Sequence, residues 1–256
     1  RSGLRRHELR LDATPGGGVG ERFMLAGRFT QPLLARAGDW ARWSGTLYAQ
    51  LPSADLAQLR AHVSLPFELQ AGTGAARAWL DLSNGQWRRA TLDTALDAVE
   101  LKLGPTLEPL ALRHLHGRFE AERSNGELRL SARRLQFSAG EAAWPASQFS
   151  LRLAQRQRLN RPGWSELPVT GGEFSADRLD LAVMAQIAER LPLPDNIRSG
   201  LGELAPQGVV QGLQASWTGA AEWPAHYRVK GRVGGLSIAA LPAPPGSAAS
   251  GAQAPP

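Results

Sequence analysis

Two histidines in this sequence have the spacing of a metal-binding pair. His114 and His116 are two residues apart, so on a β-strand both imidazoles would project from the same face. Such a pair can share one metal ion, but a metal site needs at least a third ligand. Because no third ligand is apparent nearby in the sequence, we interpret both as polar side chains on a strand and predict no metal site.

Acidic residues also occur close enough together to suggest acid–base chemistry. Glu120 and Glu122 would share one face of a strand, and Asp93, Asp97 and Glu100 follow one another closely. Paired carboxylates of this kind can serve as general acid and general base. These residues lie among arginines, however, so we interpret them as surface charge.

Other catalytic and cofactor-binding patterns are missing from the sequence. His7, His62 and His226 have no obvious catalytic serine or carboxylate partner in the sequence, and no Gly-x-Ser-x-Gly motif occurs. The glycines between residues 16 and 20 are not followed by Gly-Lys-Ser/Thr, so they do not form a phosphate-binding loop. Cysteine is absent, which excludes thiolate chemistry and leaves the redox compartment open. We therefore predict a protein without catalytic residues, cofactor or metal.

The elements that would position any site are mostly β-strands. Apolar and polar residues alternate with a period of two in many segments, as at Phe23, Leu25 and Phe29. Asn84-Gly85 and Ser124-Asn125-Gly126 separate such segments and are typical of tight hairpin turns. This pattern predicts a mainly β fold with an antiparallel, meandering sheet.

Helical periodicity is limited to three short segments, near 53–63, 182–191 and 195–205. Ser53 could cap the first and Asp195 the third, while Pro192 and Pro194 would end the second. Residues 242–256 are almost entirely Pro, Ala, Gly and Ser, a composition that cannot bury enough apolar surface to fold. We therefore predict one β-rich segment over 1–241, followed by a flexible linker or loop.

The net charge of +6 comes almost wholly from arginine. The arginines are scattered singly through the alternating segments and form no basic cluster with interleaved aromatics, which favours a solvated outer face and argues against nucleic-acid binding. No apolar run reaches the roughly 18 to 20 residues of a membrane-spanning helix.

Strands with one apolar face need a cover for that face. The short helices have too little apolar surface to cover so many strands, so the cover is a second sheet, the same sheet curled over, or lipid. A β-sandwich is the commoner solution, and the residues alone favour it.

A recurring order of motifs resembles the YhdP family of AsmA-like bacterial envelope proteins. The segment GGEFSADRLDLAVMAQIAERLPLPDNIRSGLGELAPQGVVQGLQASWTG, Gly171 to Gly219, has the family's strand, helix, LPLP break, second helix and Pro-x-Gly strand that ends in Trp. The segments Leu47 to Gly85 and Tyr227 to Leu236 are also similar to the family. The resemblance rests on order and spacing, and no single residue in it is chemically diagnostic.

The resemblance implies a fold and a function. Members are very long proteins, anchored in the inner membrane, with an incurved β-sheet whose apolar interior conducts phospholipid across the periplasm. The expectation is therefore a long incurved antiparallel sheet, or β-groove, with a β-sandwich as the alternative. The resemblance also implies that this chain is an internal, periplasmic fragment without enzymatic activity. Its expected partners are phospholipid acyl chains, and it would reach membranes through the missing parts of the full-length protein. A dry scaffold or an unrecognised hydrolase is the rival function, and protein partners stay unknown.

Apolar residues on the inward phase of the predicted strands are the candidate lining of this groove. They are Phe23, Leu25, Phe29, Leu80, Leu82, Phe119, Leu128, Leu130, Phe149, Leu151, Leu153, Leu213, Trp217, Val229 and Val233. Several tryptophans fall near predicted loops or strand ends, where they would line a lipid-facing rim or plug the sheet edges. These are Trp40, Trp43, Trp144, Trp164 and Trp223.

Overall fold

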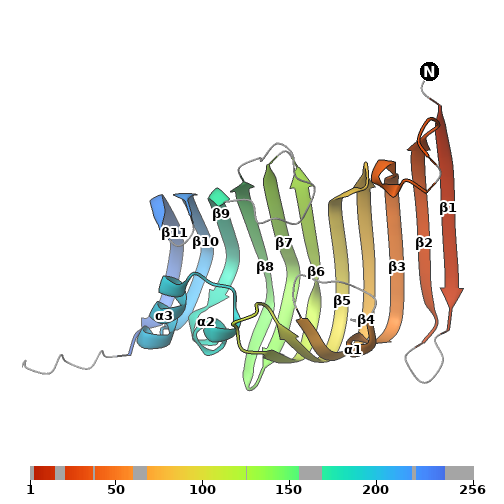
Figure 1. Cartoon of the computed structure of the whole chain (residues 1–256). Coiled ribbons are helices and arrows are strands. Elements are labelled where there is room, and N and C mark those ends of the chain that lie inside the picture. The colour runs from red at the N-terminus through yellow and green to blue at the C-terminus, as the bar shows by residue number, and fades with distance from the viewer. Residues whose placement is uncertain are drawn as a thin grey trace, which may run out of the picture.

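Eleven strands form one antiparallel sheet in which spatial order repeats sequence order (Figure 1). The computed structural model describes residues 3–14, 21–36, 38–59, 68–124, 126–155, 169–220 and 223–239. The strands are β1 (Leu4–Ala13), β2 (Phe23–Pro32), β3 (Ser44–Asp55), β4 (Glu68–Ser83), β5 (Gln86–Lys102), β6 (Leu110–Ser124), β7 (Glu127–Ala139), β8 (Ala142–Gln155), β9 (Val169–Asp180), β10 (Gln207–Gly219) and β11 (Pro224–Ser237). The predicted meander is confirmed.

Tight turns at the upper end of the sheet in Figure 1 follow the turn chemistry of the sequence. Asn84 and Gly85 have φ values of 50° and 69° and join β4 to β5. Positive φ at both central residues matches the right-handed twist of the flanking strands. Gly126 has a φ of 83° at the turn between β6 and β7.

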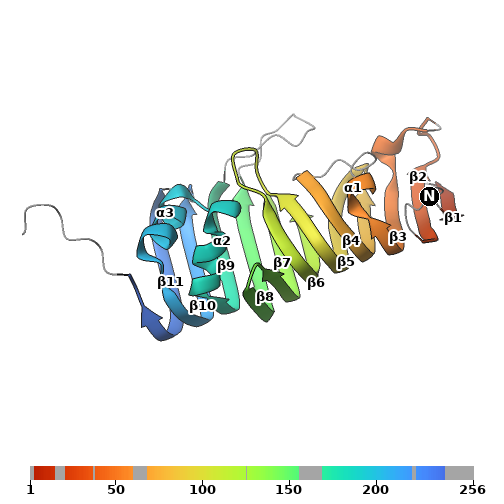
Figure 2. The ribbon, with the colours of Figure 1, turned by 90° about the horizontal axis from the view of Figure 1, so that it is seen from below.

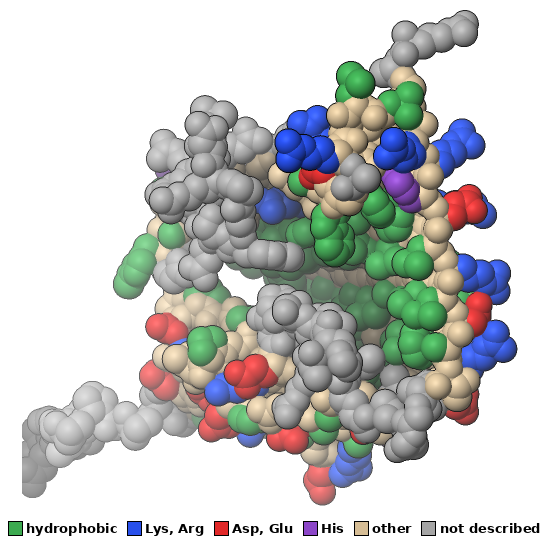
Figure 3. Space-filling view, turned by 45° about the vertical axis from the view of Figure 1, so that its right-hand side comes forward, with side chains coloured by type: hydrophobic (Ala, Val, Ile, Leu, Met, Phe, Trp, Pro, Cys, Tyr) green, Lys and Arg blue, Asp and Glu red, His purple; other side chains and the backbone are tan. Residues whose placement is uncertain are grey.

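The sheet curls into an open groove. Figure 2 shows the strands side by side along a curved wall, and Figure 3 shows hydrophobic side chains inside the hollow with charged side chains outside. All described strands belong to this single sheet, so the β-sandwich alternative is wrong and the incurved sheet is confirmed.

Several strands contain a β-bulge or a left-handed residue where the sheet bends. Register shifts occur between Leu51 and Ala54 in β3, between His116 and Arg118 in β6, and between Gln211 and Gln214 in β10. Ala98 in β5 and Arg134 in β7 have φ values of 49° and 51°. Bulges bend a strand and increase its twist, so this line of bulges turns the lower part of the sheet inward.

Three short α-helices lie at the lower end of the sheet (Figures 1 and 2): α1 (Leu56–Leu59), α2 (Leu181–Ile187) and α3 (Asp195–Leu204). The 3-10 turn η2 (Ala188–Arg190) follows α2, whereas η1 (Trp40–Arg42) lies before β3, beside the upper turn at Gly85. The backbone N–H groups of Ala182 and Val183 donate to the Asp180 carboxylate, which caps α2.

Two of the predicted caps are wrong. Ser53 lies within β3, and Asp55 instead accepts a hydrogen bond from the Ala57 N–H at the start of α1. Asp195 is already the first residue of α3, after Pro194, and forms an ion pair with Arg198. The chain stays extended two residues longer than the Ser53 cap predicted because β3 continues to pair with β4 through Asp55.

The dry core lies below the line of bulges, where the inturned strands meet α1 and α2. It consists of Leu56, Leu96, Val99, Leu101, Leu110, Leu112 and Ile187. Burying one such side chain contributes roughly 1.5–3 kcal/mol. The core therefore lies at the lower end of the sheet, and Ile187 docks the predicted second helix onto it. Residues 242–256, the predicted linker, lie outside the described residues.

Candidate functional site

Cross-strand pairing brings apolar residues into continuous rows along the inner wall of the groove. The middle row passes through all eleven strands without a polar residue: Leu9, Gly27, Leu47, Leu80, Ala90, Ala121, Leu130, Leu151, Phe174, Ala215 and Val229. Directly paired residues share a face of the sheet. This row is therefore one uninterrupted apolar band.

A second apolar row runs below it, nearer the core. The lower row is Leu11, Leu25, Ala49, Ala78, Leu92, Phe119, Ala132, Phe149, Ala176 and Leu213. Large and small side chains alternate irregularly along both rows. Together the rows form an apolar surface several strands wide.

The upper row, nearest the hairpin turns, is mixed. It contains apolar residues such as Phe29, Leu82, Leu128 and Leu153, but it also includes His7 and Arg123. The groove is thus apolar in its depth and becomes polar toward its upper rim.

All of the predicted lining residues lie on this inner face. Leu25, Phe119, Phe149 and Leu213 are in the lower row; the middle row contains Leu80, Leu130, Leu151 and Val229; the upper row contains Phe29, Leu82, Leu128, Leu153 and Trp217. Phe23 pairs with Ala13, and Val233 pairs with the buried Val210. Their contact with lipid stays a prediction.

Several members of the rows were not predicted from the sequence. Leu47 and Leu92 alternate with polar neighbours just as the predicted residues do, so period-two alternation could have found them. Phe174 was missed because two glycines precede it and only one apolar neighbour continues its phase. The alanines and Gly27 carry no hydrophobic signal that separates inner from outer positions.

Solvent reaches the middle of the groove although its wall is apolar. Leu92 is 38% exposed and Leu130 is 37% exposed, and both lie on inner strands of the sheet rather than at its edges. Among the described residues, no second sheet packs on these side chains. An exposed, contiguous apolar surface of this kind marks a binding surface.

An aromatic ladder connects the groove to the core. Phe137 stacks on Trp144 with ring centroids 5.4 Å apart, Trp144 contacts Phe149 at 5.7 Å, and Phe149 contacts Phe174 at 6.3 Å. The buried Trp144 Nε1 donates to Ser147 Oγ at 2.6 Å. Trp144 is therefore a structural plug and not part of a rim.

The other predicted rim tryptophans differ among themselves. Trp43 stacks on His7 at 4.5 Å beside Phe29, near the upper rim, whereas Trp40 and Trp223 are exposed. Trp164 lies outside the described residues. Within the described part of the chain, the buried Nε1 atoms of Trp43 and Trp217 have no hydrogen-bond partner.

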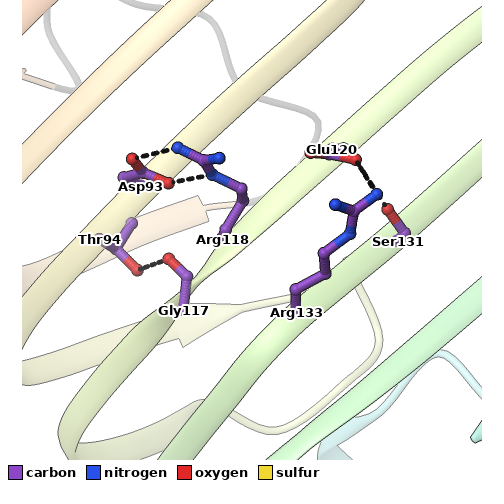
Figure 4. Close-up of polar contacts among 7 residues, drawn as sticks. All are labelled: Asp93, Thr94, Gly117, Arg118, Glu120, Ser131 and Arg133. Carbon is purple, nitrogen blue, oxygen red and sulfur yellow. Dashed lines mark hydrogen bonds and ion pairs between the residues drawn. The ribbon is translucent and has the colours of Figure 1, made fainter.

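The outer face carries the charges that could have suggested chemistry. Glu120 accepts a hydrogen bond from Ser131 and pairs with Arg133 at 3.3 Å (Figure 4). Glu122 pairs with Arg89 at 3.1 Å. These carboxylates point away from the groove and are neutralised by arginines. They therefore support the interpretation as surface charge.

The strongest of these pairs joins β5 to β6. Arg118 Nε and Nη2 donate to the Asp93 carboxylate at 2.6 and 2.8 Å (Figure 4). Hydrogen bonding from Arg118 lowers the pKa of Asp93 below its ordinary value, against the opposing effect of desolvation. Two-point pairing of this kind positions strands but leaves no free acid for catalysis.

The same outer face has a depression over β5 to β11, lined by side chains such as Arg129, Ser150 and Gln214. Ser150 and Ser175 hydrogen-bond to each other at 2.9 Å there. Because this depression is lined mainly by polar and charged side chains, it offers no continuous apolar surface, and the apolar groove is the better candidate site.

Comparison with known proteins gives one match. The family model described as YhdP protein matches residues 2–250. Comparisons with curated proteins and with solved structures find no match. Among the described helices, none has the length and hydrophobicity needed to cross a membrane.

Proposed function

Because this chain belongs to the YhdP family of bacterial envelope proteins, we propose that its groove carries phospholipid acyl chains as part of a route between the inner and outer membranes. The observation that supports the proposal most strongly is the middle row, apolar on all eleven strands yet open to solvent at Leu130. A dry protein core would cover such a row.

The groove would act by partitioning and not by catalysis. An acyl chain laid along the rows exchanges water for leucine, phenylalanine and alanine side chains, and each buried methylene contributes roughly 0.8 kcal/mol. The open side lets the headgroup stay in water, so no charged group has to enter the apolar wall. A continuous surface without deep pockets favours sliding over tight binding at one position.

The segment would lie in the periplasm as part of a protein anchored in the inner membrane. Scattered charges on the outer face keep such a wall soluble, and β1 and β11 are the outermost strands of the described sheet. The groove could therefore continue into neighbouring parts of a longer protein. Membranes would be reached through those parts.

Site-specific cross-linking in cells tests this proposal. Leu92 faces the groove and its neighbour Thr91 faces outward, because Thr91 pairs with Trp79 and Glu120 in an outer row. Benzoylphenylalanine at position 92 should cross-link phospholipid, and the same group at position 91 should not. Native mass spectrometry of the purified chain should also show bound phospholipid.

Three outcomes separate the rival functions. Equal labelling at positions 91 and 92 would indicate nonspecific membrane contact. No lipid at position 92 and none in the purified chain would favour a scaffold. Turnover of the bound lipid by the purified chain would favour a hydrolase.

A further inference from the structure

Three potential metal ligands come together on the outer face, away from the apolar rows. Asp97 on β5 is the direct cross-strand partner of His114 on β6, and His116 follows two residues later. One ligand atom from each of the three lies within 4.8 Å of the other two. Among the described residues, no other group of His, Cys, Asp and Glu meets this condition.

The geometry of the histidines suits a shared ion. His114 and His116 have ring centroids 6.5 Å apart and planes at 79°, so the two rings do not stack face to face. Imidazole binds metal through an edge nitrogen, in the ring plane. The His114 Nδ1 atom already lies 2.5 Å from Asp97 Oδ1.

We propose that Asp97, His114 and His116 bind one divalent transition-metal ion, with Zn²⁺ as the representative. Two imidazoles and one carboxylate are a ligand set that zinc takes in open sites, with bonds of about 2.0–2.2 Å and water in the fourth position. Imidazole ligands also disfavour Mg²⁺ and Ca²⁺, which prefer oxygen. This site does not depend on the proposed lipid function.

Binding requires the three side chains to adjust, because ligand atoms that lie within 4.8 Å of one another must reach the spacing of a single coordination sphere. Ligand atoms on a tetrahedral ion at these bond lengths are about 3.3 Å apart. Asp97 Oδ1 and His114 Nδ1 must therefore separate by somewhat less than 1 Å, and the ion replaces the hydrogen bond that joins them. The Asp97 and His114 side chains are 60% and 61% exposed, so both are free to adjust.

The position of the site suggests what the ion does. Asp97 directly precedes Ala98, the left-handed residue where β5 bends toward the core. An ion bound there would fasten β5 to β6 at the start of the bend. Because the ion binds only the folded arrangement, it would stabilise that arrangement by mass action.

Calorimetric titration of the chain without a histidine tag tests the proposal. After treatment with a chelator, the protein should bind one equivalent of ZnCl₂ and show no heat with MgCl₂. The variants Asp97→Asn, His114→Ala and His116→Ala should each weaken zinc binding at least about tenfold. His226→Ala, which removes an exposed histidine on β11, should leave both stoichiometry and affinity unchanged.

Thermal melting and Co²⁺ substitution provide independent readouts. Zinc should raise the Tm of the unaltered chain and of His226→Ala, but not of the three site variants. Cobalt should give the visible absorption of a site with nitrogen and oxygen ligands. This absorption should be lost in His116→Gln, a variant that keeps a polar side chain and replaces His116→Ala if the latter does not fold. Absence of zinc binding by the unaltered chain, or full binding by the site variants, overturns the proposal.

Discussion

The strand β5 contains two regions that both place apolar residues on the inner face but have opposite surroundings. Leu92, in the open groove, is 38% exposed, whereas Val99, in the core below the bend, is 1% exposed. Both are aliphatic residues of the inner face. The alternation of apolar and polar residues therefore defines a face, but what covers that face decides whether it is a core or a groove.

Local chain geometry makes the difference between the two regions. Below Ala98 the strands turn inward, and Leu56 of α1 and Ile187 of α2 pack on them. Above it, within the described residues, nothing equivalent to the helices packs on Leu92 or Leu130. The same sheet thus packs against helices at its lower end and presents an open surface above.

The largest expected effect is a charge placed in the core. Leu112→Asp would bury a carboxylate beside Val99, its partner across the strands, where Leu112 is only 5% exposed. An unpaired buried charge costs several kcal/mol, so we expect loss of cooperative folding or a large fall in the urea midpoint. Arg113→Asp, on the exposed neighbour, should change stability by no more than about 0.5 kcal/mol. Equal stability of the two variants would mean that the core is not dry.

A smaller loss is expected from the hydrogen bond under the aromatic ladder. Ser147→Ala leaves Trp144 Nε1 buried without its acceptor, which should cost about 1–3 kcal/mol in urea unfolding. Adding Trp144→Phe should cost less than the sum of the two single changes, because the unsatisfied donor is then gone. Strict additivity would show that the hydrogen bond contributes nothing.

The ion pair between Asp93 and Arg118 should make a pH-dependent contribution. Since Arg118 lowers the pKa of Asp93 in the folded state, the stabilisation is complete above the ordinary aspartate pKa. It is lost as the pH falls through the lowered value. Both side chains are partly exposed, so Arg118→Met should reduce stability by at most about 1 kcal/mol near neutral pH.

Urea unfolding at a series of pH values checks this contribution. The difference between the unaltered chain and Arg118→Met should shrink toward zero in acid, and Asp93→Asn should abolish it. A constant difference at every pH would assign the effect to packing of Arg118 on Trp79. The guanidinium carbon of Arg118 lies 5.9 Å from the centroid of the Trp79 ring.

The smallest effect on stability, and the largest on lipid binding, is expected in the open groove. Leu130→Asp keeps its carboxylate accessible to water, so its stability should fall by less than about 1 kcal/mol. Phospholipid recovered with the chain should nevertheless drop strongly, and Leu130→Asn should have a weaker effect on lipid. Unfolding would indicate a covered core at this position, and normal folding with normal lipid binding would contradict the proposed path.

The sequence was sufficient for those parts of the fold that depend on local chemistry. Alternation located the strands, and Asn84-Gly85 located a turn with two positive φ values. The curled sheet did not follow from the residues, which favoured a sandwich; it followed from the family resemblance. Physical pattern alone cannot decide this because both folds present the same apolar face.

Features that depend on contacts between strands were beyond the sequence. Asp97 is 17 residues from His114, and only the pairing of β5 with β6 brings it to the histidines. Ala98 and Arg134 adopt left-handed backbone conformations that their residue types do not favour, so the bends could not be read from composition. The Ser53 cap failed because β3 pairs with β4 beyond it.

Every strand pairs only with its neighbours in the chain, and this has a consequence for how the molecule is made. A new strand can dock as soon as its predecessor is in place, so folding can proceed from one end while the rest of the chain is still being synthesised. It also sets the unit of evolutionary change. Gain or loss of a two-stranded hairpin lengthens or shortens the wall and leaves the direction of every later strand unchanged. Gain or loss of a single strand reverses the direction of all the strands that follow it.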